Sequence, residues 1–127
     1  MIDALFAQTN YLATKNMLDA TALRHEAIAS NLANLETPNY KRLDLAPSFN
    51  SALQQAMISK DAARLNGLRP TLAVDTTAAA ANLDGNTVQL ESELMQLNQN
   101  TLNHTLETQL MTGAFMKLRL AITGHNA

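Results

Sequence analysis

The stretch SNLANLETPNYK, Ser30–Lys41, decides how this chain is organised. It follows directly on a long periodic segment, yet it is dense in Asn, Thr and Pro. Pro38 pushes the preceding residue, Thr37, out of the helical region. Asn side chains bond to nearby backbone groups and so favour turns. We therefore predict that a long helix ends here in an ordered turn rather than in a flexible tail.

Upstream of this turn, apolar residues recur at steps of three, four and seven. The set comprises Ile2, Leu5, Phe6, Leu12, Met17, Ala20, Leu23 and Ala27. Such spacing places side chains on one broad face of a helix. No Gly or Pro interrupts the pattern before Pro38. The pattern predicts one helix of roughly 25 to 30 residues, running from Ile2 to about Leu32.

A second long helix is predicted after the segment LDGNTVQLESEL, Leu83–Leu94. Asn86 is a candidate N-cap, and Gln89 three residues later can complete a capping box. Glu91 lies near the positive end of the helix dipole, and Gly124 is a stop signal after the last apolar residue. We expect this helix to span residues 86–123.

Within this helix, positions 90, 94, 97, 101, 104, 108, 111, 115, 118 and 122 alternate steps of four and three. That spacing is typical of a coiled-coil seam, here with a polar middle. A second apolar stripe runs beside it through Met95, Leu102, Leu106 and Leu110. The remaining positions are rich in amides, which cost less to bury than charges do. They indicate burial against a neighbour or, alternatively, a solvated face that happens to be amide-rich.

The segment between the helices, residues 43–85, is harder to interpret. A short helix around Phe49, Leu53 and Met57 is expected, and the Thr and Ala run at 76–81 is expected to be a loop, although alanines could also join a helix. The chain is therefore predicted to be all-α, with the two long helices paired as an antiparallel hairpin or coiled coil. Residues 1–42, 43–85 and 86–123 would together form one structural unit.

Composition and motifs exclude several function classes. The net charge of −2 gives no electrostatic basis for binding nucleic acid or an anionic membrane. No run approaches the ~20 apolar residues of a membrane span, and the N-terminus does not resemble a Sec-type signal peptide. There is no cysteine, and His25, His104 and His125 lack metal-ligand spacing. No nucleophile motif or phosphate loop is present, so we expect neither an enzyme nor a cofactor or metal site.

The turn also carries a family resemblance. Ala29–Leu45 resembles the N-terminal signature of the bacterial flagellar axial proteins, which include rod and hook subunits. The matching positions are Ser30, Asn31, Leu32, Ala33, Asn34, Thr37, Pro38, Tyr40 and Lys41. The start of the second helix is similar to the corresponding segment of proximal rod subunits, through Gly85, Asn86, Val88 and Glu91. Gln89 departs from the Asp that is more usual there, but its side chain can still cap.

The resemblance implies a structural subunit of the flagellar proximal rod. Such subunits polymerise through their terminal helices into a tube that transmits torque and conducts exported subunits. The implied partners are copies of the chain itself, other rod proteins, the export gate or adaptors, and components next to the MS ring. The implied location is the periplasmic rod of the basal body, reached through the flagellar type III export apparatus. Alternatives are another short rod, axial or adaptor subunit, or a soluble helical-hairpin binding protein.

The resemblance also implies roles for individual residues. Asn31 and Asn34 would satisfy backbone groups, Pro38 would set the exit of the chain from the helix, and Tyr40 would dock on a neighbouring helix. The helix–helix seams, within and between subunits, would be made by Leu5, Leu12, Leu23, Leu90, Leu94, Leu97, Met111, Phe115 and Leu118.

Overall fold

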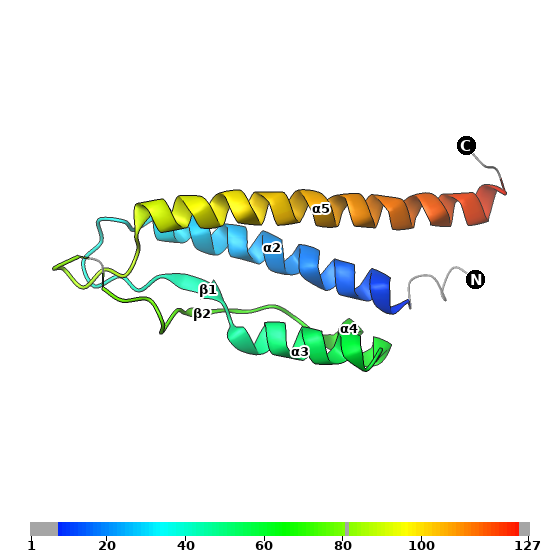
Figure 1. The fold of residues 1–127 in the computed structure, drawn as a ribbon, viewed down its shortest axis with the longest axis horizontal. Helices are drawn as coiled ribbons and strands as arrows, with labels where there is room; N and C mark the ends of the chain where they lie inside the picture. The colour runs from blue at the N-terminus through cyan, green and yellow to red at the C-terminus, as the bar shows by residue number, and fades with distance from the viewer. Residues whose placement is uncertain (1–7, 81, 125–127) are drawn as a thin grey trace.

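The computed structural model describes residues 8–80 and 82–124. The elements in chain order are α2 (Thr9–Ala33), β1 (Leu43–Leu45), α3 (Pro47–Ile58), α4 (Ala62–Gly67), β2 (Leu72–Val74) and α5 (Leu90–Thr123). The long helices α2 and α5 lie side by side, and the short helices α3 and α4 pack on α2 (Figure 1). Consequently α2 is the central element, with α5 on one side and the short helices on the other.

The two long helices run in opposite directions. The Asn31 amide near the end of α2 donates to the Glu93 carboxylate near the start of α5, 3.2 Å away. At the other end, the Tyr11 and Phe115 rings meet edge to face with centroids 6.4 Å apart. The mostly helical fold predicted from periodicity is therefore present. Leu5, with Ile2 and Phe6, lies outside the described residues.

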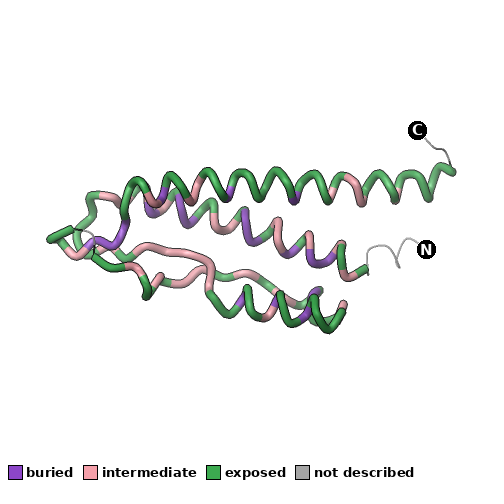
Figure 2. The backbone as a smooth tube through the Cα atoms, in the orientation of Figure 1, coloured by how far each residue is buried: buried purple, intermediate pink, exposed green. Residues whose placement is uncertain are grey.

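The apolar core lies between α2 and the short helices rather than between α2 and α5. It consists of Leu12 and Ala20 from α2, Phe49, Leu53 and Ala56 from α3, and Leu65 from α4. In Figure 2, the buried positions of α2 alternate with partly buried ones along its length, while most of α5 is exposed. The Asn16 amide adds a polar tie, donating to the Leu65 carbonyl oxygen at 2.8 Å. The short helices therefore anchor on α2 through its apolar face.

The all-α prediction omitted a small sheet. Strands β1 and β2 pair antiparallel, with Leu43 opposite Val74 and Leu45 opposite Leu72. Each strand has only three residues, which is too short to give a recognisable alternation of side chains. The middle segment also holds two helices, where one was expected. Within it, residues 76–80 form turn and irregular structure, as the loop interpretation predicted.

Helix α5 begins at Leu90, four residues later than expected from the capping pattern. Its N-cap residue is Gln89, which makes no side-chain cap bond. Asn86 does not cap α5, because its side chain is fully buried against the end of α2 and bonds there instead. Residues 86–89 connect the turn after α2 to the start of α5, and the helix begins only after them, at Leu90.

Core packing gives a direct prediction. Replacing Leu65, which is 0% exposed, by Ala should lower the free energy of unfolding by about 2 to 5 kcal/mol, since it leaves a cavity between α4 and α2. Leu102→Ala, at 67% exposure on α5, is the matched control and should change the free energy by less than about 0.5 kcal/mol. Urea unfolding of both variants checks this, and equal losses would place the core elsewhere.

Candidate functional site

The end of α2 and the entry to α5 form one interlocked junction. Helix ends leave their last carbonyl groups without partners. The buried Asn86 amide donates to the carbonyl oxygens of Asn34, Leu35 and Thr37 at 2.8, 3.1 and 2.8 Å. The Asn86 side-chain oxygen accepts from the Val88 amide at 2.8 Å. A side chain from the segment before α5 therefore satisfies backbone carbonyl groups of the turn that follows α2, 49 to 52 residues earlier in the chain.

The turn itself holds two residues in left-handed conformations. Asn39 has a φ of 60°, and its backbone N–H donates to the Asp84 carbonyl oxygen at 2.9 Å. Gly85 has a φ of 81°, and a Cβ there would lie 2.6 Å from the Asn39 side-chain oxygen. Only glycine fits that contact without strain. The Lys41 ammonium closes the turn by donating to the Gly85 carbonyl oxygen at 2.7 Å.

Asn31 joins α2 to the first strand. Its amide nitrogen donates to the Leu43 carbonyl oxygen at 2.9 Å, and its side-chain oxygen accepts from the Leu43 amide at 2.8 Å. The Asn31 side chain thus makes the same two hydrogen bonds to Leu43 that the backbone of a neighbouring antiparallel strand would make. The Tyr40 hydroxyl lies 3.0 Å from the Ser30 hydroxyl and donates to Asn31 at 3.3 Å. The Tyr40 hydroxyl therefore bonds to the end of its own α2.

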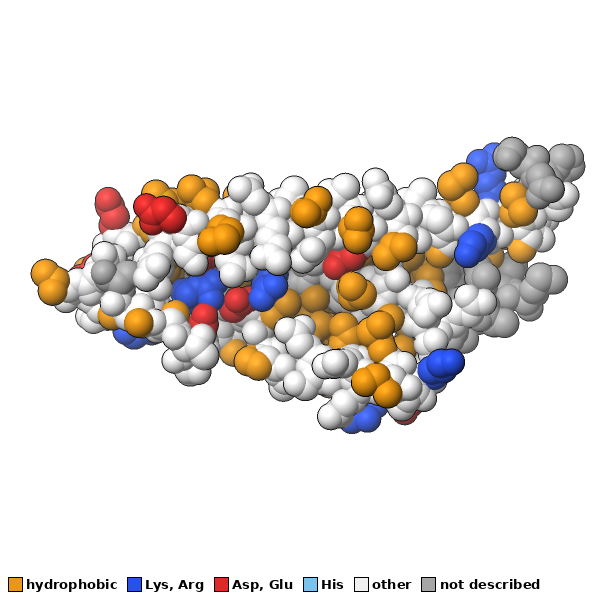
Figure 3. All heavy atoms as spheres, viewed as in Figure 1, with side chains coloured by type: hydrophobic (Ala, Val, Ile, Leu, Met, Phe, Trp, Pro, Cys, Tyr) orange, Lys and Arg blue, Asp and Glu red, His pale blue; other side chains and the backbone are white. Residues whose placement is uncertain are grey.

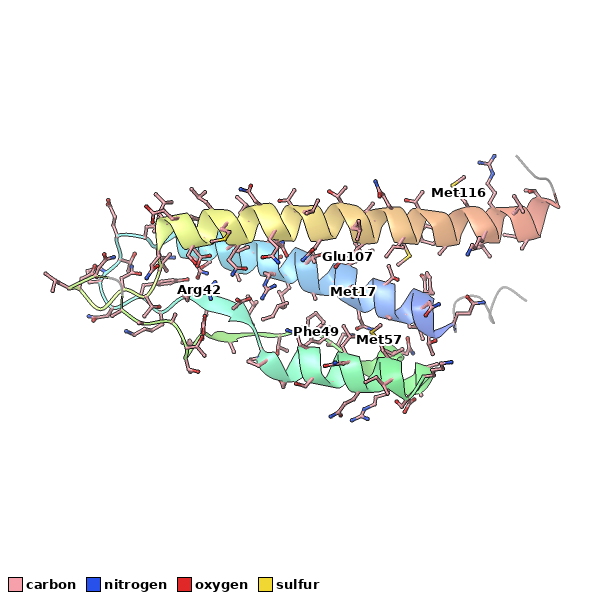
Figure 4. All side chains as sticks on the ribbon, viewed as in Figure 1. Met17, Arg42, Phe49, Met57, Glu107 and Met116 are labelled. Atoms are coloured by element: carbon pink, nitrogen blue, oxygen red, sulfur yellow. The ribbon has the colours of Figure 1, made fainter. Side chains whose placement is uncertain are left out.

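An ion-pair network is centred on Arg42, which directly follows this turn and is labelled in Figure 4. The Arg42 Nε donates to the Glu93 carboxylate at 2.7 Å, and the Glu93 side chain is 0% exposed. Arg42 also pairs with Asp75, beyond the end of β2, and with Asp44 of β1. Asp44 in turn accepts from the Arg24 Nε at 2.8 Å. Charges from α2, β1, the segment after β2 and α5 therefore meet around one guanidinium.

Burial and pairing act in opposite directions on these groups. Burial alone lowers the pKa of Arg42, but hydrogen bonds to Glu93 and Asp75 outweigh it and raise the pKa. Burial raises the pKa of Asp44, whereas the Arg24 hydrogen bond, the Leu45 amide and the charges of both arginines hold it below its usual range. Pairing therefore favours the charged forms of Arg42 and Asp44.

A polar seam continues along α5. Glu93, Asn100 and Glu107 are buried and spaced by seven residues, so they share the face that packs on α2. The Asn100 amide donates to the Thr21 carbonyl oxygen at 2.8 Å. The Thr21 hydroxyl donates to the Glu107 carboxylate at 2.8 Å, and Figure 4 labels Glu107 on the side of α5 that faces α2. The contact between the long helices is thus polar at its most buried positions.

His104 is the titratable neighbour of this seam. Its Nδ1 lies 3.2 Å from the Thr21 hydroxyl. Burial raises the pKa of Glu107, and the Thr21 hydrogen bond and the charge of His104 offset part of that rise. Burial therefore disfavours the ionised form of the Glu107 carboxyl group in this seam.

The predicted seam residues fall in several environments. Leu12 is buried in the apolar core. Leu23, Leu97, Met111 and Leu118 are partly buried, and Leu90, Leu94 and Phe115 are 44%, 45% and 48% exposed. The residues buried against α2 at 93, 100 and 107 lie one position before the expected 94, 101 and 108. Contacts of the exposed members between copies of the chain remain a prediction.

The signature residues divide into two groups. Asn31, Asn86 and Val88 are buried, and Ser30, Leu32, Asn34, Tyr40 and Gly85 are partly buried. Ala33, Thr37, Pro38, Lys41 and Glu91 are exposed. The Asn34 amide donates back to the Ser30 carbonyl oxygen at 2.8 Å, and its side-chain oxygen accepts from the Thr37 hydroxyl at 3.1 Å. The junction is therefore built by the inward-facing part of the signature.

Sequence reasoning missed the ion-pair network. The helix dipole accounts for Glu93 only as a charge near the start of a helix, and no sequence pattern selects Arg42. These two residues are 51 positions apart, and Arg42 and Asp75 are 33 apart. No local spacing connects such partners. The one available signal was a carboxylate inside an apolar helical pattern, since charged residues are seldom fully buried without a partner.

Across residues 8–80 and 82–124, no three His, Asp or Glu side chains converge in a way that would hold a metal ion. Within the same residues, none of the helices combines the length and hydrophobicity that crossing a membrane requires.

The Arg42–Glu93 pair gives a testable prediction. Glu93→Gln should lower the free energy of unfolding by about 3 kcal/mol, because it leaves the Arg42 charge without its buried partner. A glutamine also cannot accept from both Arg42 and Asn31. Glu91→Gln, exposed in the same first turn, is the control and should cost less than about 1 kcal/mol. Urea unfolding checks both, and a Glu93→Gln variant as stable as Glu91→Gln would contradict a stabilising pair.

Glu107 gives a prediction with the opposite sign. Because the pKa of Glu107 is raised in the folded chain, folding favours its protonated form, and stability falls as pH rises above about 4.3, the unfolded value. Glu107→Gln keeps an acceptor for Thr21 and cannot ionise. It should be more stable than the natural chain at pH 7, and the difference should shrink towards pH 4. Urea unfolding across that range measures it, and a less stable variant at pH 7 would contradict the prediction.

Comparison with known proteins finds similarity that includes these residues. Residues 17–41, the second half of α2 and the signature turn, match the family described as "Flagella basal body rod protein". The chain is 29% identical over 123 residues to the flagellar basal body rod protein FlgB of Borrelia hermsii, covering 83% of this chain and 89% of that protein. It is 29% identical over 129 residues to FlgB of Escherichia coli strain K12, covering 89% and 91%.

A third relative spans nearly the whole of both chains. FlgB of Salmonella typhimurium strain LT2 is 27% identical over 143 residues, covering 99% of this chain and 100% of the relative. The local match therefore contains Asn31, and the long alignments extend through the extended run 86–89 and α5, so both halves of the junction lie within the similarity. Over most of its length, the chain is similar to flagellar basal body rod proteins of the FlgB type, and its residues 17–41 match the rod-protein family model.

Proposed function

We propose that this chain is a structural subunit of the flagellar basal-body rod, in the proximal part of the rod. It polymerises through its long terminal helices into a tube that transmits torque and conducts exported subunits. The observation that carries the proposal is that the family match, residues 17–41, ends in the turn that Asn86 and Gly85 hold in place. The residues that match the family therefore form the turn after α2, and this turn is bonded to the segment that leads into α5.

The surface of α5 supports a role in assembly. Leu94, Met95, Leu102, Leu106 and Leu110 are 45% to 67% exposed. A row of this kind on a long helix is more typical of an interaction surface than of an isolated monomer. In the proposal, α2 and α5 form an antiparallel coiled-coil hairpin whose remaining faces are covered by neighbouring subunits.

The proposal includes partners and a route. The partners are copies of this chain, other rod proteins, and components of the export gate and of the MS-ring region. The chain reaches the periplasmic rod through the flagellar type III apparatus. The absence of cysteine from the sequence is compatible with this route, since no disulfide has to be formed or broken during export.

An in-frame deletion of the gene in its own host tests the proposal. The expected result is loss of swimming and of hook protein outside the cell, because later axial subunits have no rod on which to assemble. The natural gene should restore both. A variant with Asn31, Asn34 and Pro38 replaced by Ala should not, whereas Asn66→Ala, an exposed amide on α4, should. Full motility with normal hooks in the deletion strain would contradict a rod role and favour a soluble helical-hairpin binding protein.

A further inference from the structure

Helix α5 carries an apolar ridge on the face opposite α2. Its positions are 95, 99, 102, 106, 109, 113, 116 and 120, which alternate steps of four and three. At 100° per residue they lie about half a turn from the buried Glu93, Asn100 and Glu107. Met95, Leu102, Leu106, Met116 and Leu120 are 66%, 67%, 58%, 64% and 42% exposed. We call these five side chains the outer ridge.

The outer ridge is long and free of charge. Between Glu93 and Lys117, the only Asp, Glu, Lys or Arg is Glu107, which is buried against α2. The exposed fractions correspond to apolar surface on the order of 600 Å², the upper end of what a typical monomer leaves in its largest patch. A standard interface buries about 800 Å² per partner. With its flanking amides, the outer ridge therefore has the area and the chemistry of an interface.

The chain also has a concave apolar surface. A groove of about 420 Å³ lies between α2, α3 and α5. Figure 3 shows apolar side chains gathered in this hollow, and Figure 4 labels Met17, Phe49 and Met57 around it. Leu53 lies deep in it, and Ile58 on α3 is 77% exposed at its edge. We call it the α3 groove.

The charged side chains that line the α3 groove already have hydrogen-bond partners within the chain. Arg24, one of its lining residues, donates to Asp44 at 2.8 Å. Glu107, another, accepts from the Thr21 hydroxyl at 2.8 Å. Removing one leucine side chain leaves a cavity of about 150 Å³, so the groove can receive two or three such side chains. Leu102 and Leu106, one helical turn apart, have that size and carry no charge that would have to be desolvated.

We propose that the outer ridge of one copy docks in the α3 groove of a second copy. This inference rests on the proposed function, which supplies many copies in one assembly, and it names the contact that would join them. A ridge that paired with the same ridge would give a closed two-fold dimer. A ridge in a groove is a contact between different surfaces, and repeating it gives a ring or a helical tube. The outer ridge is uncharged, and the charged groups of the α3 groove already have hydrogen-bond partners, so both surfaces fit that arrangement.

The cysteine-free sequence allows a clean cross-linking test. Leu106→Cys marks the outer ridge and Met57→Cys marks the α3 groove, and both positions are exposed, at 58% and 44%, so neither should disturb folding. The full chain is expressed in its own host, and basal bodies are purified and oxidised. A strain expressing both single variants should form disulfide dimers at least tenfold more abundantly than either variant alone. A chain carrying both substitutions should form a ladder of multimers.

Thr105→Cys, exposed and one position before Leu106, is the matched control and should cross-link weakly with Met57→Cys, because it lies about 100° around the helix. Strong self-linking of Leu106→Cys without mixed dimers would overturn the proposal in favour of ridge-to-ridge pairing. Basal bodies that contain the chain but give no mixed dimers would also overturn it and leave the rod function standing. Absence of the chain from basal bodies would refute the rod function itself. Circular dichroism of each variant confirms that it folds.

Discussion

The pair between the Arg42 guanidinium and the Glu93 carboxylate is the interaction on which the arrangement of this chain depends. Glu93 lies in the first turn of α5, and Arg42 directly precedes β1. The same guanidinium holds Asp75 after β2, and Asp44 connects it to Arg24 on α2. An ion pair with no exposed carboxylate persists only if its remaining hydrogen-bonding groups are satisfied. Asn31 meets that requirement, since it donates to Glu93 as well as to Leu43.

Asparagine suits this junction because its amide both donates and accepts without a charge. Asn31 satisfies both backbone groups of Leu43, and Asn86 satisfies three carbonyl groups beyond the end of α2. An Asp at either position would accept but not donate. A Lys would donate but bring a charge with it. The backbone groups of the first strand and of the turn after α2 are buried and need uncharged hydrogen-bond partners. This need explains why Asn is frequent in Ser30–Lys41.

Periodicity predicted the long helices because each repeats its pattern over many turns. It placed the end of α2 correctly, since Pro38 and the Asn cluster act locally. It placed the start of α5 too early, because Asn86 fits a capping pattern but is engaged by Asn34, Leu35 and Thr37. The two strands pair residues 27 to 31 positions apart, and Arg42 lies 33 and 51 positions from Asp75 and Glu93. Single-sequence patterns carry no information at that range. Asp75 and Glu93 therefore looked like ordinary loop and helix charges.

The distribution of polarity on α5 connects the fold to assembly. Its most buried positions against α2 are Glu93, Asn100 and Glu107, whereas Leu102 and Leu106 are exposed. Polar contacts of this kind fix register but contribute modestly to stability, because they replace hydrogen bonds to water. The apolar surface that would give most to stability by leaving water lies on the opposite face. The polar seam thus specifies how α2 and α5 pair within one chain. The exposed apolar surface of α5 would contribute to stability if another surface covered it.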